Sequence, residues 1–179
     1  MSEEGSRSMS KEMGNISTLR CLCGSVELEA TGAPIICAAC HCADCLEGSR
    51  RLEALPNARP ILDSYGGTPY VLYRKDRVKY LKGAQLIKSL KVDDDSPNRA
   101  YTTCCNSFML LDLPNPMHWV PVFRGGFQGK VPSLEMRINA KFKKGSGDFP
   151  RDVPTYSSLS LKFVRKLLGS KIAMVFRGT

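Results

Sequence analysis

The chain has 179 residues, 42% of them hydrophobic, which is enough for one domain with an ordinary hydrophobic core. No apolar run approaches the roughly 18 residues of a membrane span, so we expect a soluble domain without a membrane partner. The formal net charge of +9 at pH 7 would suit contact with nucleic acid or another acidic surface. Because the basic residues are scattered along the sequence, solvated surface charge is the simpler explanation.

The first sixteen residues, MSEEGSRSMSKEMGNI, mix acids, bases, serine and glycine without an apolar run. This composition predicts a disordered tail over residues 1–16. The segment also lacks the hydrophobic stretch of a secretory signal and the pattern of a transit peptide. We therefore expect an intracellular protein, cytoplasmic or nuclear, in a compartment where thiols stay reduced.

The central part of the sequence is rich in strand and turn signals. Val26, Leu28 and Ala30 alternate with acidic residues, which is the pattern of a half-buried strand. A short helix is expected over 44–55, and Pro56 and Pro60 should end it. Further strands are expected at 70–73, 78–81, 86–92, 108–113, 119–123 and 134–142. The polar run at 93–98 predicts a hairpin tip, and the whole pattern predicts a mainly β fold of antiparallel sheets.

The C-terminal segment departs from this pattern. Its apolar residues recur at helical spacing, at Tyr156, Leu159, Phe163 and Leu167. Pro154 before them and Gly169 after them are start and stop signals, so we expect an amphipathic helix. We expect it to pack its apolar side on a sheet, as an extension over residues 151–179 of a domain that spans residues 17–150.

The eight cysteines fall into three groups with the close spacing of metal ligands. The groups are Cys21 with Cys23, then Cys37, Cys40, Cys42 and Cys45, then the adjacent Cys104 and Cys105. Disulfides are the alternative, but a bridge between cysteines two residues apart closes a ring far from relaxed geometry. A tetrahedral ion accepts such spacing readily, so we expect zinc, with two ions per chain.

The first and third groups can form one site only if strands bring them together from distant parts of the sequence. A hairpin that returns through the third pair would do so. A closed four-sulfur structural zinc site would then consist of Cys21, Cys23, Cys104 and Cys105. Adjacent side chains on a strand point to opposite faces, so the third pair requires a distorted backbone.

The middle group has the features of a reactive site. Cys40, Cys42 and Cys45 place three sulfurs around one turn, and three protein ligands with an open position are typical of a catalytic zinc. Such an ion could bind an incoming thiol as its thiolate and orient it toward an electrophile. Cys37 could instead supply a fourth sulfur and make this site structural as well.

Two polar residues near these cysteines are expected to have structural roles. His41 lies between two ligands on an extended segment, so its side chain should face away from them. Asp63 precedes the glycines of a turn and should cap that turn.

The order of the cysteines resembles a known family. The motifs are C-x-C-G at 21–24, C-H-C-x-x-C at 40–45 and a later cysteine pair. They resemble the domain of glutathione-dependent formaldehyde-activating enzymes, shared with a centromere-associated protein, over approximately residues 17–125. The resemblance implies the Mss4-like β fold with two zinc ions, one structural and one that serves thiol chemistry. Asp63, the turn at 66–68 and the Cys104-Cys105 doublet resemble an uncharacterised branch of this superfamily.

Carried over by position, the resemblance assigns Cys21, Cys23 and Cys105 to the structural zinc, and Cys40, Cys42 and Cys45 to the second zinc. The third motif of the family is usually C-x-x-C-G, with two cysteine ligands. In this chain Thr102 replaces the first of these two cysteines. We expect Cys104 to supply the missing sulfur ligand. The implied activity is that of a carbon-sulfur lyase that forms or releases thiol adducts of formaldehyde-like aldehydes, with glutathione as the thiol partner. The alternative is a non-catalytic, zinc-stabilised module that binds nucleic acid, chromatin or a protein.

Overall fold

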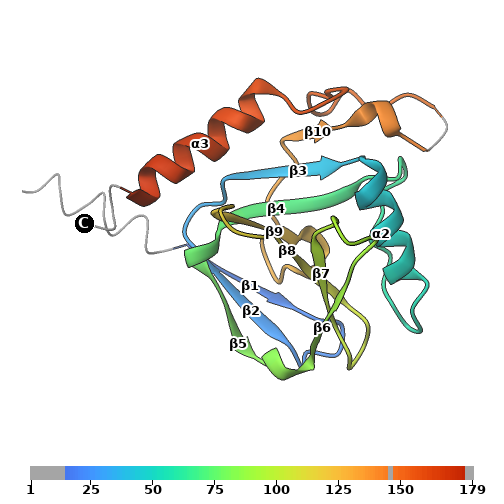
Figure 1. The fold of residues 1–179 in the computed structure, drawn as a ribbon, viewed down its shortest axis with the longest axis vertical. Coiled ribbons are helices and arrows are strands. Elements are labelled where there is room, and N and C mark those ends of the chain that lie inside the picture. Colours follow the sequence, from blue (N-terminus) through green and yellow to red (C-terminus); the bar gives the residue numbers. More distant parts are fainter. Residues whose placement is uncertain (1–14, 145–146, 176–179) are drawn as a thin grey trace, which may run out of the picture.

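Two β-sheets and two α-helices make up the fold of the computed structural model, which describes residues 15–144 and 147–175 (Figure 1). The strands are β1 (Ile16–Arg20), β2 (Glu27–Thr31), β3 (Ile36–Cys40), β4 (Thr68–Arg74), β5 (Val78–Lys82), β6 (Ile87–Leu90), β7 (Asn98–Thr102), β8 (Phe108–Asp112), β9 (Trp119–Phe123) and β10 (Met136–Ile138). The helices are α2 (Ala43–Glu53) and α3 (Leu161–Val175). The prediction of a mainly β fold with a short helix after the second cysteine group and a C-terminal helix is confirmed.

The smaller sheet has the strand order β1-β2-β5, and the larger sheet has the order β10-β3-β4-β9-β8-β7-β6. Neighbouring strands are antiparallel except β10, which runs parallel to β3. The chain reaches β10 through a long connection from β9 instead of a hairpin, which permits the parallel pairing. The larger sheet is therefore mixed, whereas the sequence had predicted antiparallel sheets.

The larger sheet is buried on both faces. Along β4, Val71 and Tyr73 point into the space between the two sheets, while Tyr70 and Leu72 point toward the helices. This alternation is the period of two expected of a strand, and both of its phases are apolar because both faces are covered. The smaller sheet covers one face, and α2 and α3 lie on the other (Figure 1).

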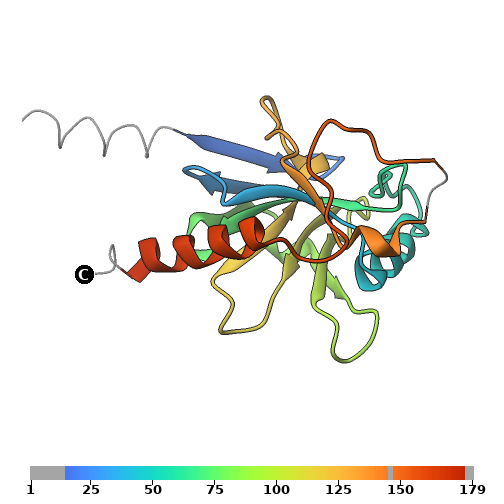
Figure 2. The same ribbon diagram turned by 90° about the horizontal axis from the view of Figure 1, so that it is seen from above.

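Helix α3 packs on the larger sheet through two side chains. Phe163 and Leu167 are buried in the cluster that lies between this sheet and the helices. The ring of His118 lies beneath the helix, with Nε2 3.0 Å from the backbone oxygen of Leu167 and 2.8 Å from the Ser170 hydroxyl. The C-terminal helix therefore covers the sheet as expected (Figure 2). His118 is part of the contact between them.

The bounds of α3 differ from the prediction. The helix begins at Leu161, where the Ser160 hydroxyl accepts a hydrogen bond from the N–H of Phe163, and it continues past Gly169. Tyr156, which fits the helical spacing, instead donates its N–H to the Arg137 oxygen of β10 at 2.9 Å. Pairing with the sheet thus replaces the expected first turn of the helix.

The predicted N-terminal tail ends earlier than residue 16. Strand β1 begins at Ile16, inside the segment 1–16 that was expected to be a disordered tail, because its backbone pairs with Thr31 of β2. The rest of that prediction, residues 1–14, lies outside the described residues. Among the described residues, no helix combines the length and apolar character required to cross a membrane.

Candidate metal sites

Seven of the eight cysteines gather into two clusters, and all eight are free thiols. The four-sulfur site consists of Cys21, Cys23, Cys104 and Cys105. The three-sulfur site consists of Cys40, Cys42 and Cys45. Within each site the ligand atoms lie within 4.8 Å of one another. The expected grouping of the cysteines is thus present in the fold, and either site could bind a metal ion.

Two hairpin turns form the four-sulfur site. Cys21 and Cys23 lie in the turn between β1 and β2, where Gly24 adopts the left-handed conformation with φ of 74°. The other two sulfurs come from the turn between β7 and β8. The N–H of Leu22 donates to the Ser107 hydroxyl at 2.9 Å and joins the two turns directly. Since one turn belongs to the smaller sheet and the other to the larger sheet, the site connects the two sheets.

The adjacent cysteines can face one site because they lie in a turn and not on a strand. The N–H of Thr102 donates to the Ser107 oxygen at 3.0 Å and closes the turn, and Asn106 has a positive φ of 50°. This turn is the distorted backbone that the sequence required. The Thr102 hydroxyl lies 3.4 Å from the Cys105 sulfur. Thr102 occupies the position of a cysteine ligand in the family that the sequence resembles.

The sulfur separations of the four-sulfur site suit a tetrahedral ion. The Cys21 sulfur lies 3.6 Å from that of Cys23 and 3.9 Å from that of Cys104, and Cys23 and Cys104 are 3.3 Å apart. Zinc–sulfur bonds of about 2.3 Å at tetrahedral angles separate the sulfurs by roughly 3.8 Å. The N–H of Val26 donates to the Cys21 sulfur at 3.2 Å, as expected for a residue that orients a thiolate ligand.

The three-sulfur site lies where β3 ends and α2 begins. Cys40 is the last residue of β3, and Cys42 is the N-cap of α2, whose sulfur accepts a hydrogen bond from the N–H of Cys45 at 3.4 Å. The Cys40 and Cys42 sulfurs are 3.4 Å apart. The positive end of the helix dipole stabilises negative charge at this position, so the local fold favours a thiolate among these three sulfurs.

Two further side chains contact these sulfurs. Asn139 Nδ2 donates to the Cys40 sulfur at 3.4 Å, and the Tyr70 hydroxyl lies 4.0 Å from the Cys45 sulfur. Asn139 is there because β10 pairs with β3 and places Ile138 opposite Cys40. Neither contact could be predicted from the sequence, since neither residue stands near the cysteines in the sequence or belongs to a motif.

The thiol groups of this site influence one another. Hydrogen bonds from Cys42 and Cys45 lower the pKa of Cys40 to about 3. The hydrogen bond to Cys40 in turn raises the pKa of Cys45 well above its usual range. Of the three thiols, Cys40 is therefore the one whose deprotonated form is favoured, and its sulfur also accepts a hydrogen bond from the Asn139 amide.

Cys37 does not belong to the three-sulfur site. It lies three residues before Cys40 on β3, and an odd separation along a strand places two side chains on opposite faces. Cys37 is buried between the two sheets, whereas Cys40 packs on the side of the helices. Burial raises the pKa of Cys37 to about 11. The alternative in which Cys37 completes the site is therefore excluded by the fold.

His41 points away from the sulfurs, as expected. Its side chain is fully buried, with Nδ1 3.3 Å from the Tyr65 oxygen and Nε2 3.9 Å from an Asp63 carboxylate oxygen. That carboxylate accepts the N–H groups of Tyr65 and Gly67 and caps the turn. A Cβ at Gly67 would lie 2.4 Å from His41 Cε1, so the glycine leaves room for the ring.

A buried arginine supports the helix that carries Cys45. Arg99 on β7 is fully buried, and its guanidinium contacts the Asp44 carboxylate and donates to the Asp44 backbone oxygen at 2.8 Å. The Ser96 hydroxyl donates to the same carboxylate at 2.6 Å. The hairpin β6–β7 thereby positions the first turn of α2 and the three-sulfur site with it.

Comparison with known proteins gives a family but no activity. Residues 13–133 match the family described as "Family of unknown function (DUF6151)". Among solved structures, a Rhodobacter sphaeroides protein from the Northeast Structural Genomics effort is similar, with 17% sequence identity and a TM-score of 0.44 over 77% of this chain and 98% of the other. No curated protein matches the chain.

Proposed function

Because the chain belongs to the DUF6151 family, whose function is unknown, we propose its function from the two sulfur clusters. We propose that the protein binds two zinc ions, a structural ion at the four-sulfur site and a reactive ion at the three-sulfur site. The reactive site would form or release thiol adducts of small aldehydes, with glutathione as the thiol. The protein would then act as a carbon-sulfur lyase.

One observation carries this proposal. The three-sulfur site offers three cysteine ligands, and within residues 15–144 and 147–175 no fourth His, Cys, Asp or Glu ligand atom joins them. Three protein ligands leave a tetrahedral ion one position for a substrate, whereas four thiolates saturate it. The difference between the two sites therefore supports one reactive and one structural role.

The geometry of the four-sulfur site supports its structural role. Its sulfurs come from one turn of each sheet, so an ion there would join the sheets at this end of the molecule. Metal binding to such a site contributes directly to folding stability, because the ligands are not gathered in the unfolded chain.

At the three-sulfur site, the residues present fit a zinc ion by their number, type and spacing. When bound, zinc would supply a Lewis acid that keeps an incoming thiol deprotonated at neutral pH. Asn139 and the N–H of Cys45 would orient the Cys40 and Cys42 ligands through the hydrogen bonds described above. His41 contacts the turn at 63–67 on its far side, so we assign it a positioning role.

The proposed reaction needs no reactant other than the thiol and the aldehyde. The thiol gives up its proton to solvent, and a lone pair of the resulting thiolate sulfur forms a bond with the carbonyl carbon of the aldehyde. The π electron pair of the carbonyl moves to oxygen, which takes up a proton from solvent. Release of the aldehyde reverses these steps and breaks the carbon–sulfur bond. The site would contribute chiefly by holding the sulfur in its deprotonated form and in position.

Exchange NMR spectroscopy with glutathione and formaldehyde tests the proposal. We expect adduct exchange faster than the spontaneous rate, lost in Cys42→Ser and retained in Cys37→Ser, whose thiol lies outside both sites. Exchange at the spontaneous rate with both ions bound would contradict the enzymatic proposal and favour the binding module. That module would show affinity for nucleic acid that falls steeply with salt.

A further inference from the structure

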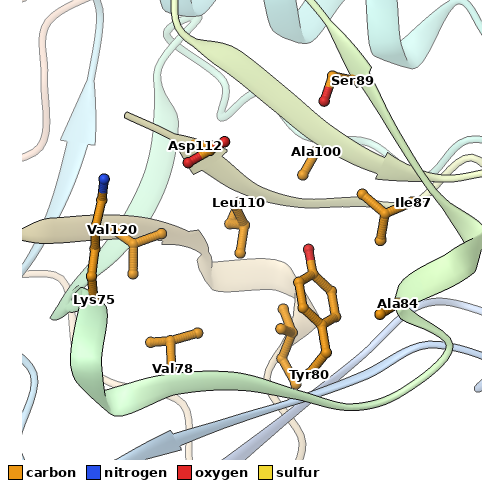
Figure 3. A pocket seen from close by; sticks show the side chains of 11 residues that line it. Lys75, Val78, Tyr80, Ala84, Ile87, Ser89, Ala100, Leu110, Asp112 and Val120 are labelled. Carbon is orange, nitrogen blue, oxygen red and sulfur yellow. The ribbon is translucent and has the colours of Figure 1, made fainter. Parts of the chain in front are cut away.

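A cavity of about 480 Å³ lies between the two sheets, and no cysteine lines it (Figure 3). Apolar side chains from six strands of both sheets form the larger part of its wall. The wall residues are Leu28, Val78, Ile87, Ala100, Leu110 and Val120. This volume falls within the range of about 300–1,000 Å³ that is usual for small-molecule sites.

The cavity reaches one edge of each sheet and is lined there by small side chains. β5 is an edge strand of the smaller sheet and β6 an edge strand of the larger, and the chain passes from one to the other through a turn at Gly83. Ala84 and Ala100 line the cavity where larger residues would fill it. Its lining thus runs from exposed residues such as Ala84 to core residues such as Leu28 and Leu110.

Four polar side chains line the cavity beside these apolar residues: Lys75, Tyr80, Asp112 and the exposed Ser89. The Tyr80 side chain projects into the cavity, and Lys75 and Asp112 lie toward one side of it (Figure 3). Lys75 Nζ donates to the Leu113 oxygen at 2.5 Å. Among the described residues, the Tyr80 hydroxyl has no hydrogen-bond partner within the protein. Burial and the Asp112 charge raise the pKa of Tyr80 to about 12, so this hydroxyl remains a donor at neutral pH.

We propose that this cavity binds a small uncharged apolar molecule that carries one hydrogen-bond acceptor, such as a ketone or ester of about the size of two fused rings. The apolar walls favour an apolar body, and Tyr80 offers its hydroxyl to the acceptor. Lys75 and Asp112 have opposite charges, so together they select neither an anionic nor a cationic ligand. This binding site is separate from both sulfur clusters and does not depend on the proposed zinc chemistry.

The test uses prodan, a neutral naphthalene ketone whose fluorescence shifts to shorter wavelength in apolar surroundings. We expect saturable binding to one site per chain of the full-length, zinc-loaded protein. Tyr80→Phe should weaken it about 3- to 10-fold, the value of one hydrogen bond. The matched control is Tyr101→Phe, which removes a hydroxyl from the face of the larger sheet that packs toward the helices, and it should leave the affinity unchanged.

Two further variants obstruct the cavity. Ala100→Trp fills it from its inner wall, but this buried position can also disturb folding. Ala84→Trp places the same ring at an exposed position of the rim, where the core is not touched. We expect Ala84→Trp to weaken prodan binding at least tenfold with an unchanged unfolding midpoint. Non-saturable binding, or equal affinity in wild type, Tyr80→Phe and Ala84→Trp, would overturn the proposal.

Discussion

Replacement of Gly48 by alanine should loosen the support beneath the three-sulfur site. Gly48 lies on the buried face of α2, where a Cβ would stand 1.9 Å from Arg99 Nε and 2.3 Å from its Cζ. Arg99 is fully buried and contacts both the carboxylate and the backbone oxygen of Asp44. The alanine would therefore displace the guanidinium and separate this ion pair.

The magnitude follows from two opposing effects. Separation of a buried ion pair costs about 3–5 kcal/mol of unfolding free energy. In the interior of a helix, alanine contributes about 1 kcal/mol more to the unfolding free energy than glycine does. We expect a net loss of about 2–4 kcal/mol, toward the lower end because the Asp44 side chain is 34% exposed and can be hydrated.

Chemical unfolding of the zinc-loaded protein measures this loss. Gly169→Ala is the matched control, because Gly169 lies within α3 and a Cβ there would meet no atom within 4 Å. The control should be as stable as the wild type or more stable by up to about 1 kcal/mol. If Gly48→Ala and Gly169→Ala had equal free energies of unfolding, the proposed role of Arg99 beneath α2 would be refuted.

Two further predictions concern residues outside the metal sites. Cys37→Ala should leave both zinc ions bound in native mass spectrometry, and loss of one ion would show that Cys37 is a ligand after all. Burial lowers the pKa of His118 below its usual value, so the unfolded chain binds more protons than the folded chain at this residue. Its contribution to stability is present above about pH 6.5 and is lost as the pH falls through the folded-state pKa. Wild type should therefore lose more unfolding free energy than His118→Gln between about pH 7.5 and about pH 5.5, and equal losses would contradict this.

Local patterns predicted much of the fold. The alternation in β2, the prolines after α2 and the apolar spacing around Phe163 reflect contacts within one element, so the sequence displays them directly. The three-sulfur site and each cysteine pair of the four-sulfur site were also predictable, because ligand spacing is a short-range feature. The joining of the two pairs depended instead on the expected hairpin and on the resemblance to a known family. Even the exclusion of Cys37 follows from its odd separation from Cys40 once β3 is known to be a strand.

Contacts between segments that are distant in the sequence could not be predicted from it. The parallel contact of β10 with β3 brings Asn139 to Cys40 and takes Tyr156 out of the predicted helix. The burial of Arg99 depends on a glycine of another element, Gly48, and no periodic pattern indicates it. Such contacts depend on which elements meet, and a single sequence contains little information about that.

The central claim is that the two sites differ in the number of sulfurs they offer to zinc. X-ray absorption spectroscopy of the purified protein, with metal analysis, tests it directly, and Cys104→Ser and Cys42→Ser separate the two signals. We expect two zinc ions per chain, one bound by four sulfurs at about 2.3 Å and one by three sulfurs and a lighter donor. Four sulfurs around both ions, or disulfide bonds and no bound metal, would contradict the account.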